Sequence, residues 1–388
     1  MHIAYLIPTI DRIGGAERQL TLLATGMAQR GWQVTVIALA GNGGHAALDL
    51  SAANVSFLSL EMRHGLFDPR GWQRLRRWVE SAKPEILHAH LPHAALMARG
   101  IRLLVPARVL IDTIHSPATG SIARRLGYRL TSRLPDLVTA VSRAAARPWL
   151  GARAIHPAEL SVIPNGIDSD WWKPASDPGS QRAASDEFRW IAVGRLDPVK
   201  DYSTLLCAFS MLPQSARLTV AGTGRLEPAL RLQAAELGIA DRVSFVGFQN
   251  DVRQLMQNSD AFVLSSLWEG HPIALMEACL CELPAVFTET SGCRELLPDS
   301  PLPIAHVGDS VALANAMNTL MTLPQSERHK LGRDQRNRIV AHFDLASIIN
   351  RYEALYCHLL AASPRPSRRR KNNRASLQAP SDFSTRET

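Results

Sequence analysis

Two glutamates, Glu269 and Glu277, are the residues whose type and spacing in this 388-residue sequence suggest chemistry most directly. The apolar run AFVLSS predicts a strand before Glu269, and the run PIALMEACL predicts a helix that contains Glu277. The eight-residue spacing is a little over two helical turns, so both carboxylates are expected near one helix face, at its N-terminal end. Backbone N–H groups from Gly270 onward would bind an anion there. A ligand with phosphates and flanking hydroxyls, such as a nucleotide sugar, fits this arrangement.

Two cations in the segment VGRLDPVKD, Arg195 and Lys200, are expected on a strand-to-helix loop that faces the same ligand. A pyrophosphate leaving group is a multiply charged anion. One bidentate cation and one point cation would neutralise it as a glycosidic bond breaks. Taken alone, the pair would be ordinary solvated loop charges. Beside Glu269 and Glu277 we interpret it as part of a phosphate site.

Two features of the first half also suit a ligand. Gly14 and Gly15 lie between the first expected strand and the helix AERQLTLL. Small residues there let the backbone approach a phosphate or a sugar, although a tight turn would need them too. His115 ends the strand VLIDTIH, where its imidazole could donate a hydrogen bond to a sugar hydroxyl or help to hold developing charge. A lone histidine at a strand end is more often structural.

Two patterns that could suggest a metal are interpreted otherwise. His88, His90 and His93 in ILHAHLPHA have no obvious fourth ligand, so no metal site is predicted, and His90 is interpreted as lining the active-site cleft. Asp168 and Asp170 form a D-x-D sequence in an expected turn, without the strand context of a metal-binding D-x-D motif. We interpret this sequence as a chance match.

The setting of the two glutamates, S-x-x-E-G-x-P-x-x-x-x-E, resembles the retaining GT-B glycosyltransferases of family 4. Four motifs of that family occur in the expected order, and the resemblance covers roughly residues 1–360. It implies that Glu277 holds the ribose hydroxyls and that Glu269 binds the donor sugar. It also implies that Arg195 and Lys200 bind the donor diphosphate. No metal and no cofactor is expected if these cations neutralise the leaving group.

The same resemblance assigns further residues. His115 is expected to point at the donor sugar and to be catalytic, together with Arg195, Lys200 and Glu269. The segment VGFQNDV matches the part of the family that meets the nucleobase. The other donor-binding residues that the resemblance implies are Gly14, Gly15, Phe248, Gln249, Gly270 and Ile273. The motif P-N-G-I-D at 164–168 matches a signature at the end of the first domain. His271-Pro272 departs from the F-G that often follows Glu-Gly in the family.

The elements that must position these residues follow an α/β pattern. Apolar runs alternate with helices of ten or more residues, which predicts parallel βαβ units and two Rossmann-like, doubly wound domains. The resemblance to family 4 implies that these domains have the GT-B arrangement and face a central cleft. Ligands bind beyond the carboxyl ends of such strands. The expected parts are a first domain at 1–172, a linker at 173–187, a second domain at 188–342, a helix at 343–362 and a basic disordered tail at 363–388. The resemblance implies that the first domain is the acceptor side, that the second binds the nucleotide sugar, and that the helix crosses back to the first domain.

Composition agrees with a globular protein. Apolar residues make up 46% and charged residues 20% of the chain, and no apolar run reaches the ~18 residues of a membrane-spanning helix. The start MHIAYLIPTI reads as a buried strand rather than a signal peptide, so a cytoplasmic protein is expected. The five cysteines have no C-x-x-C spacing and are expected to be reduced core thiols.

The net charge of +8 is uneven, because the excess of Lys and Arg lies before residue 187 and after residue 362. This favours an anionic partner surface, and we expect a membrane rather than a specific nucleic acid. Two helical stretches are candidates, PRGWQRLRRWVE at 69–80 and SIARRLGYRLTSRLPD at 121–136. The first is better interpreted as an ordinary helix with a basic outer face, because it lies just before the strand PEILHAH. The second is favoured because family members with lipid-linked acceptors often carry such a helix.

These inferences predict an enzyme: a metal-independent hexosyl- or N-acetylhexosaminyl-transferase. It would move a sugar with retention from a nucleoside-diphosphate donor, UDP-linked, to a glycan or lipid-linked acceptor in polysaccharide or lipopolysaccharide biosynthesis. It is expected in the cytoplasm, at the inner face of the cell membrane. Two alternatives remain open: a sugar-nucleotide epimerase on the same fold, and a catalytically silent protein that binds nucleotide sugars or membranes.

Overall fold

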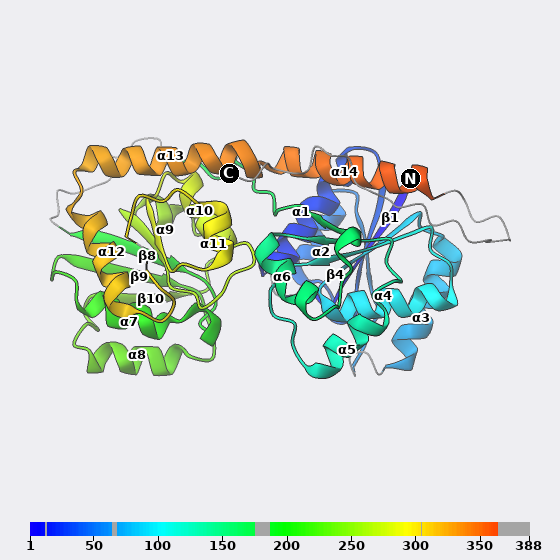
Figure 1. Ribbon diagram of the computed structural model, residues 1–388, viewed down its shortest axis with the longest axis horizontal. Coiled ribbons are helices and arrows are strands. Elements are labelled where there is room, and N and C mark those ends of the chain that lie inside the picture. Colours follow the sequence, from blue (N-terminus) through cyan, green and yellow to red (C-terminus); the bar gives the residue numbers. More distant parts are fainter. Residues whose placement is uncertain (12–13, 64–67, 175–186, 304, 364–388) are drawn as a thin grey trace. The chain divides into compact units, whose positions relative to one another are not determined.

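The computed structural model describes residues 1–11, 14–63, 68–174, 187–303 and 305–363, and within them the chain forms two compact units (Figure 1). Unit 1 contains Met1–Gly166 and the C-terminal helix from Ala346, and unit 2 contains Ile167–Leu345. Each unit has one sheet, and every strand pair in both sheets is parallel. The predicted α/β class with two doubly wound domains is confirmed.

The sheet of unit 1 has seven strands in the order β3-β2-β1-β4-β5-β6-β7. The strands are β1 His2–Ile7, β2 Gln33–Ala38, β3 Ser56–Ser59, β4 Ile86–His90, β5 Val109–Ile114, β6 Leu137–Ala140 and β7 Leu160–Val162. The helices are α1 Gly15–Gln29, α2 Gly44–Ala52, α3 Pro69–Ala82, α4 Pro92–Leu104, α5 Ile122–Leu130, α6 Arg143–Gly151 and α14 Leu345–Ala362, with a 3-10 turn at Pro157–Glu159.

The core of unit 1 lies between this sheet and its helices. Strands β1, β4 and β5 are buried along their whole length, which explains why they are continuous apolar runs and not alternating ones. The last helix, α14, completes the unit. It runs beside α1 (Figure 1), where Arg30 donates a hydrogen bond to Asn350 and Trp32 donates one to Glu353.

The sheet of unit 2 has five strands in the order β10-β9-β8-β11-β12. The strands are β8 Phe188–Val193, β9 Ala216–Ala221, β10 Val243–Gly247, β11 Ala261–Leu264 and β12 Ala285–Phe287. The helices are α7 Tyr202–Ser210, α8 Glu227–Glu236, α9 Arg253–Gln257, α10 Ile273–Leu280, α11 Ser291–Leu296, α12 Ser310–Thr322 and α13 Gln325–Phe343, with a 3-10 turn at Pro198–Lys200. The strand order changes direction between β8 and β11, and in open α/β sheets the ligand binds beside such a switch point.

The expectations for the linker, the tail and the cysteines are tested only in part. Most of the expected linker and nearly all of the expected tail lie outside the described residues. All five cysteines are free, but only Cys279, Cys281 and Cys293 are buried, whereas Cys357 is exposed on α14, so the expectation of core thiols is wrong there. None of the described helices is long and apolar enough to span a membrane.

Candidate functional site

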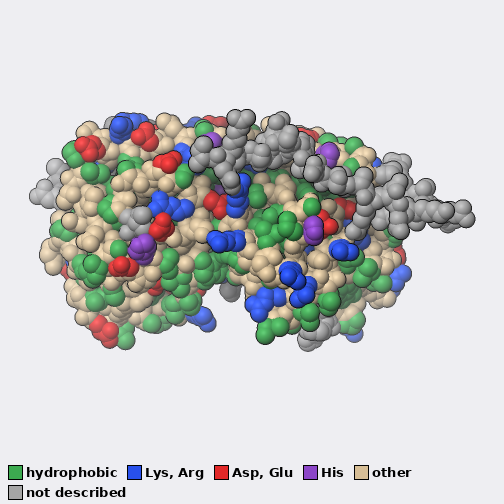
Figure 2. All heavy atoms as spheres, in the orientation of Figure 1, with side chains coloured by type: hydrophobic (Ala, Val, Ile, Leu, Met, Phe, Trp, Pro, Cys, Tyr) green, Lys and Arg blue, Asp and Glu red, His purple; other side chains and the backbone are tan. Residues whose placement is uncertain are grey.

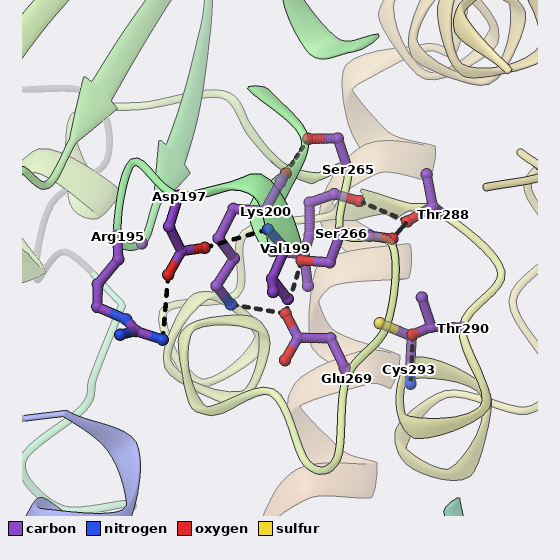
Figure 3. Close-up of polar contacts among 12 residues, drawn as sticks. Arg195, Asp197, Val199, Lys200, Ser265, Ser266, Glu269, Thr288, Thr290 and Cys293 are labelled. Atoms are coloured by element: carbon purple, nitrogen blue, oxygen red, sulfur yellow. Dashed lines mark hydrogen bonds and ion pairs between the residues drawn. The ribbon is translucent and has the colours of Figure 1, made fainter. Parts of the chain in front are cut away.

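The candidate site of unit 2 centres on an ion pair between Lys200 and Glu269. Lys200 Nζ lies 2.6 Å from Glu269 Oε1, and the same oxygen accepts a hydrogen bond of 2.6 Å from Ser266 Oγ (Figure 3). The Lys200 and Glu269 side chains are 19% and 11% exposed, so solvent screens the pair only partly. Both contacts use Oε1, and among the described residues Oε2 has no hydrogen-bond partner.

Two strand ends bring these residues together. The chain leaves β8, turns at Asp197, whose carboxylate accepts a hydrogen bond from the N–H of Val199, and presents Lys200 from the following 3-10 turn. Glu269 comes from the loop after β11, the strand beside β8. Ser265 Oγ donates to Lys200 O at 2.8 Å and Leu267 N donates to Val199 O at 2.8 Å, so the two loops are bonded directly to each other.

Two glycines let the backbone pack tightly around this pair. A Cβ at Gly292 in α11 would lie 2.5 Å from the carbonyl oxygen of Glu269 and 2.9 Å from that of Gly270. Gly222 has a φ of +145°, and a Cβ there would lie 2.0 Å from Gly194 O, in the loop that leads to Lys200. Both positions therefore require glycine for the loops to keep their places.

Arg195 lies in the same loop as Lys200 but points elsewhere. Its guanidinium pairs with Asp197 at 3.1 Å, and its side chain is 79% exposed (Figure 3). No described contact links it to Lys200 or Glu269. The structure brings Lys200, Glu269 and Ser266 together, while Arg195 remains an exposed cation beside them.

Glu277 is placed differently from the expectation. Helix α10 begins at Ile273, so Glu269 lies outside it and the two carboxylates do not share a helix face. Pro272, at the N-cap, fixes this start, because a proline fits the beginning of a helix but lacks an N–H. The first intrahelical bond runs from Met276 N to Pro272 O, so the N–H groups without a partner in the helix begin at Ile273 and not at Gly270. Glu277 is 5% exposed, in the middle of α10.

The remaining residues assigned to the donor in unit 2 are spread along the loop edge. Phe248, in the loop after β10, is 62% exposed. Gln249 folds back and donates to Val246 O at 2.8 Å. Gly270 is buried and Ile273 is half-buried at the start of α10. An exposed aromatic ring beside a loop at the carboxyl edge of a sheet is available for stacking on a base.

In unit 1 the predicted residues lie at the carboxyl edge of the sheet or next to it. Gly14 is the extended N-cap of α1 and Gly15 is its first residue, so neither forms a left-handed turn. His115 follows β5 and is half-buried, and burial lowers its pKa to about 4, so the imidazole is neutral at pH 7. Its Nε2 lies 2.9 Å from Nδ1 of His90.

His90, which the sequence predicts to line the cleft, is 2% exposed and lies in contact with His115. Burial lowers its pKa well below the usual value, because a charged imidazole would lose its hydration. Beside it, His88 bonds Tyr356 Oη at 2.8 Å and Thr113 Oγ1 at 2.6 Å. Within the described parts of the chain, no three His, Cys, Asp or Glu side chains form a group that could hold a metal ion.

Sequence reasoning missed Ser266, Gly292 and Tyr202, which hold the site in place. Tyr202 Oη donates to Gly194 O at 3.1 Å, and burial raises its pKa, so the hydroxyl keeps its proton. Ser266 stands in the motif S-x-x-E, and that motif was the only available signal for it. Cys293, near Glu269, is buried, which raises the pKa of its thiol to about 12 and leaves it unreactive as a nucleophile.

Open parallel α/β sheets commonly bind nucleotides beyond the carboxyl ends of their strands, which is where the Lys200–Glu269 pair lies. The family model described as "Glycosyltransferase Family 4" matches residues 13–171, and the one described as "Glycosyl transferases group 1" matches residues 176–338. The chain therefore belongs to the group 1 glycosyltransferases of family 4, and its architecture is GT-B.

This chain is similar to two proteins that are named as glycosyltransferases. It is 23% identical over 306 residues to a UDP-Gal:α-D-GlcNAc-diphosphoundecaprenol α-1,3-galactosyltransferase of Escherichia coli, covering 74% of this chain and 78% of that protein. It is 25% identical over 360 residues to the lipopolysaccharide core biosynthesis glycosyltransferase LpsE of Rhizobium meliloti, and the match covers 90% of this chain and 97% of that protein. The crystal structure of Anabaena Alr3699/HepE in complex with UDP and glucose shares the fold, with a TM-score of 0.78 and 22% sequence identity. The match covers 92% of this chain and 99% of that one.

Proposed function

We propose that this chain is a retaining glycosyltransferase that moves a hexose or an N-acetylhexosamine from a UDP-linked donor to a lipid-linked or glycan acceptor. The proposed pathway is polysaccharide or lipopolysaccharide synthesis. The observation that carries the proposal is the Lys200–Glu269–Ser266 group at the strand ends of unit 2. It places a cation beside a carboxylate, 2.6 Å apart, so that one ligand can meet the cation through an anionic diphosphate and the carboxylate through a sugar hydroxyl. Relatives that use UDP-Gal or act in lipopolysaccharide core synthesis support the donor and the pathway.

Each residue then has a distinct role. Lys200 and the exposed Arg195 bind the diphosphate and stabilise the charge that develops as the sugar leaves, without a metal ion. Glu269 uses its unpartnered Oε2 for a sugar hydroxyl, while Oε1 stays bonded to Lys200 and Ser266. Glu277 accepts hydrogen bonds from the ribose.

Four more residues complete the proposed donor site in unit 2: Phe248, Gln249, Gly270 and Ile273. Phe248 and Gln249 lie beside the base, and Gly270 and Ile273 lie beside the phosphates. In unit 1, Gly14 and Gly15 line the sugar and acceptor side, and the neutral His115 donates a hydrogen bond to the donor sugar.

The transfer itself needs no protein nucleophile. The acceptor hydroxyl attacks the anomeric carbon on the face from which the phosphate departs. The bond from that carbon to the phosphate oxygen breaks, and the acceptor proton passes to the leaving phosphate. Retention of configuration follows from this geometry.

The decisive experiment measures nucleotide release from a panel of UDP- and GDP-sugars, with and without lipid-linked acceptors. Arg195→Ala is expected to lower kcat by about 10²–10³-fold, the usual cost of losing one group that stabilises transition-state charge. Arg231→Ala is the matched control, because Arg231 is an exposed arginine of unit 2 that also pairs with a carboxylate, Glu227. Conversion of the donor sugar without nucleotide release would indicate an epimerase. Failure to turn over any donor would refute the enzyme assignment.

The partner surface we propose is an anionic membrane, contacted through α5. Ile122, Leu126 and Leu130 recur every four residues on this helix and are 75%, 53% and 77% exposed. Arg125, Arg129 and Arg133 are exposed around this apolar stripe. Figure 2 shows Lys and Arg side chains gathered with hydrophobic ones on the part of unit 1 where α5 and α6 lie. Three exposed apolar residues bordered by arginines fit a bilayer surface with anionic headgroups.

A vesicle flotation assay tests this surface. The protein is expected to float with phosphatidylglycerol-containing vesicles at low salt and to be released at high salt, whereas neutral vesicles should bind it weakly. Leu126→Asp should abolish flotation, and Leu232→Asp should not, because Leu232 is at least as exposed (62%) but lies on α8 of unit 2. Equal flotation of both variants would show that α5 is not the contact.

A further inference from the structure

We infer that His90 is a positioning residue that fixes the tautomer of His115, with the His115 proton on Nδ1, so that His115 presents a hydrogen-bond donor to the substrate. This inference rests on the proposed function for the role of His115. Its starting point is the contact between His90 Nδ1 and His115 Nε2, at 2.9 Å. His90 is the last residue of β4 and His115 directly follows β5, and these parallel strands pair in a register that places His90 opposite Thr113.

One proton must lie between the two facing nitrogens, and there are two ways to supply it. If His115 donates from Nε2, then His90 must carry its own proton on Nε2. If His90 donates from Nδ1, then His90 Nε2 is bare and His115 carries its proton on Nδ1. Both rings are neutral at pH 7, because burial lowers the pKa of each.

The surroundings of His90 Nε2 decide between the two. That nitrogen is buried and has no hydrogen-bond partner among the described residues. A buried N–H without a partner is rarer and costlier than a buried acceptor without one. The arrangement with a bare Nε2 on His90 is therefore the more stable, and it makes His90 the donor to His115.

Neighbouring rings pack against the His90 ring and hold it in the orientation that places Nδ1 toward His115. The His90 ring centroid lies 4.4 Å from that of His88 and 5.8 Å from that of Tyr5. His88 is itself held at both nitrogens, by Tyr356 and Thr113. Of the two ring nitrogens of His90, only Nδ1 has a described partner, and that partner is His115. An unconstrained neutral imidazole favours the proton on Nε2, so the structure assigns His115 the less common tautomer.

The first test is nitrogen-15 NMR of histidine-labelled protein without substrate, with the His115 signals assigned by their loss in His115→Gln. We expect a protonated Nδ1 and a bare Nε2 in the wild type. His90→Leu should shift His115 toward the Nε2-protonated form. A wild-type His115 protonated on Nε2 would overturn the inference, whatever the enzyme assays give.

The second test compares two variants of nearly equal shape. His90→Asn keeps an amide N–H where Nδ1–H stands, and His90→Leu removes it. We expect His90→Leu to lower kcat by about tenfold, which corresponds to a hydrogen bond of roughly 1.4 kcal/mol, with less change in KM. His90→Asn should restore most of this loss.

The outcomes separate the inference from the proposed function. Equal loss in both variants would show that His90 acts through packing alone, and would overturn the inference. If the wild type transfers no sugar from any donor, the proposed function fails. The NMR result then still decides the tautomer.

Discussion

Gly292 offers a sharp test of how closely the Glu269 loop must be held. In Gly292→Ala the new Cβ would meet the carbonyl oxygens of Glu269 and Gly270 at 2.5 and 2.9 Å. Real Cβ contacts essentially never fall below 3.0 Å, so the loop must move by at least about 0.5 Å. A displacement approaching 1 Å at a reacting group costs about 10²-fold in rate, or roughly 2.7 kcal/mol.

The assay is nucleotide release with the preferred donor, combined with thermal unfolding. Gly292→Ala should lower kcat/KM by about 10²-fold and the free energy of unfolding by about 1–3 kcal/mol. Gly151→Ala is the matched control, because Gly151 also lies in a helix but its Cβ would meet no atom within 4 Å. It should leave the rate unchanged and stabilise the fold by about 0.4–1 kcal/mol. A folded Gly292→Ala enzyme with wild-type kcat/KM would refute the reasoning.

Two further predictions concern stability. His271 is 7% exposed, its ring nitrogens have no partner among the described residues, and burial lowers its pKa to about 3. The unfolded chain therefore binds the extra proton first. The stability that His271 contributes is full above pH 6.5 and falls as the pH drops toward 3, by up to about 1.4 kcal/mol per pH unit. In chemical denaturation, His271→Leu should lose less of its free energy of unfolding between pH 6.5 and 4 than the wild type does. An equal loss in both proteins would show that His271 is not the group responsible. Arg99 and Asp112 form a fully buried ion pair at 2.6 Å, so Asp112→Ala should cost about 3–5 kcal/mol, and Arg99→Met combined with Asp112→Leu should recover most of it. Additive losses in the double variant would contradict this.

Much of the fold was predictable because buried parallel strands are continuous apolar runs. The runs VLIDTIH and AFVLSS became β5 Val109–Ile114 and β11 Ala261–Leu264, and the two-domain α/β class was confirmed. Helix α13 was not predicted. Only five of its nineteen residues are buried. One of them, Gly332, packs so closely against Glu282 that a Cβ there would lie 2.0 Å from the Glu282 carbonyl oxygen. A polar sequence gives little periodic signal for such a helix.

The site was predictable in its members but not in its contacts. The motifs predicted that Lys200 and Glu269 lie at the same edge of the sheet. Nothing in the sequence indicated that one oxygen of Glu269 bonds both Lys200 and Ser266. The exposed pairing of Arg195 with Asp197 depends on a local turn. His88, the neighbour of His90, is bonded by Tyr356 of α14, 268 residues away in the sequence. Such contacts arise from tertiary packing, which periodicity does not encode.

Unit 1 is built from two separate stretches of sequence, and this has a consequence for biosynthesis. Tyr356 of α14 bonds both Tyr5 and His88, so the interior of unit 1 is incomplete until the ribosome has made that helix. Unit 2, Ile167–Leu345, is continuous and is synthesised in between. At ordinary translation rates the first 166 residues wait roughly ten to forty seconds for their last helix. During that interval the nascent N-terminal half has an uncovered apolar surface where α14 will dock. Unit 2, whose residues are contiguous, can complete its interior before unit 1 does.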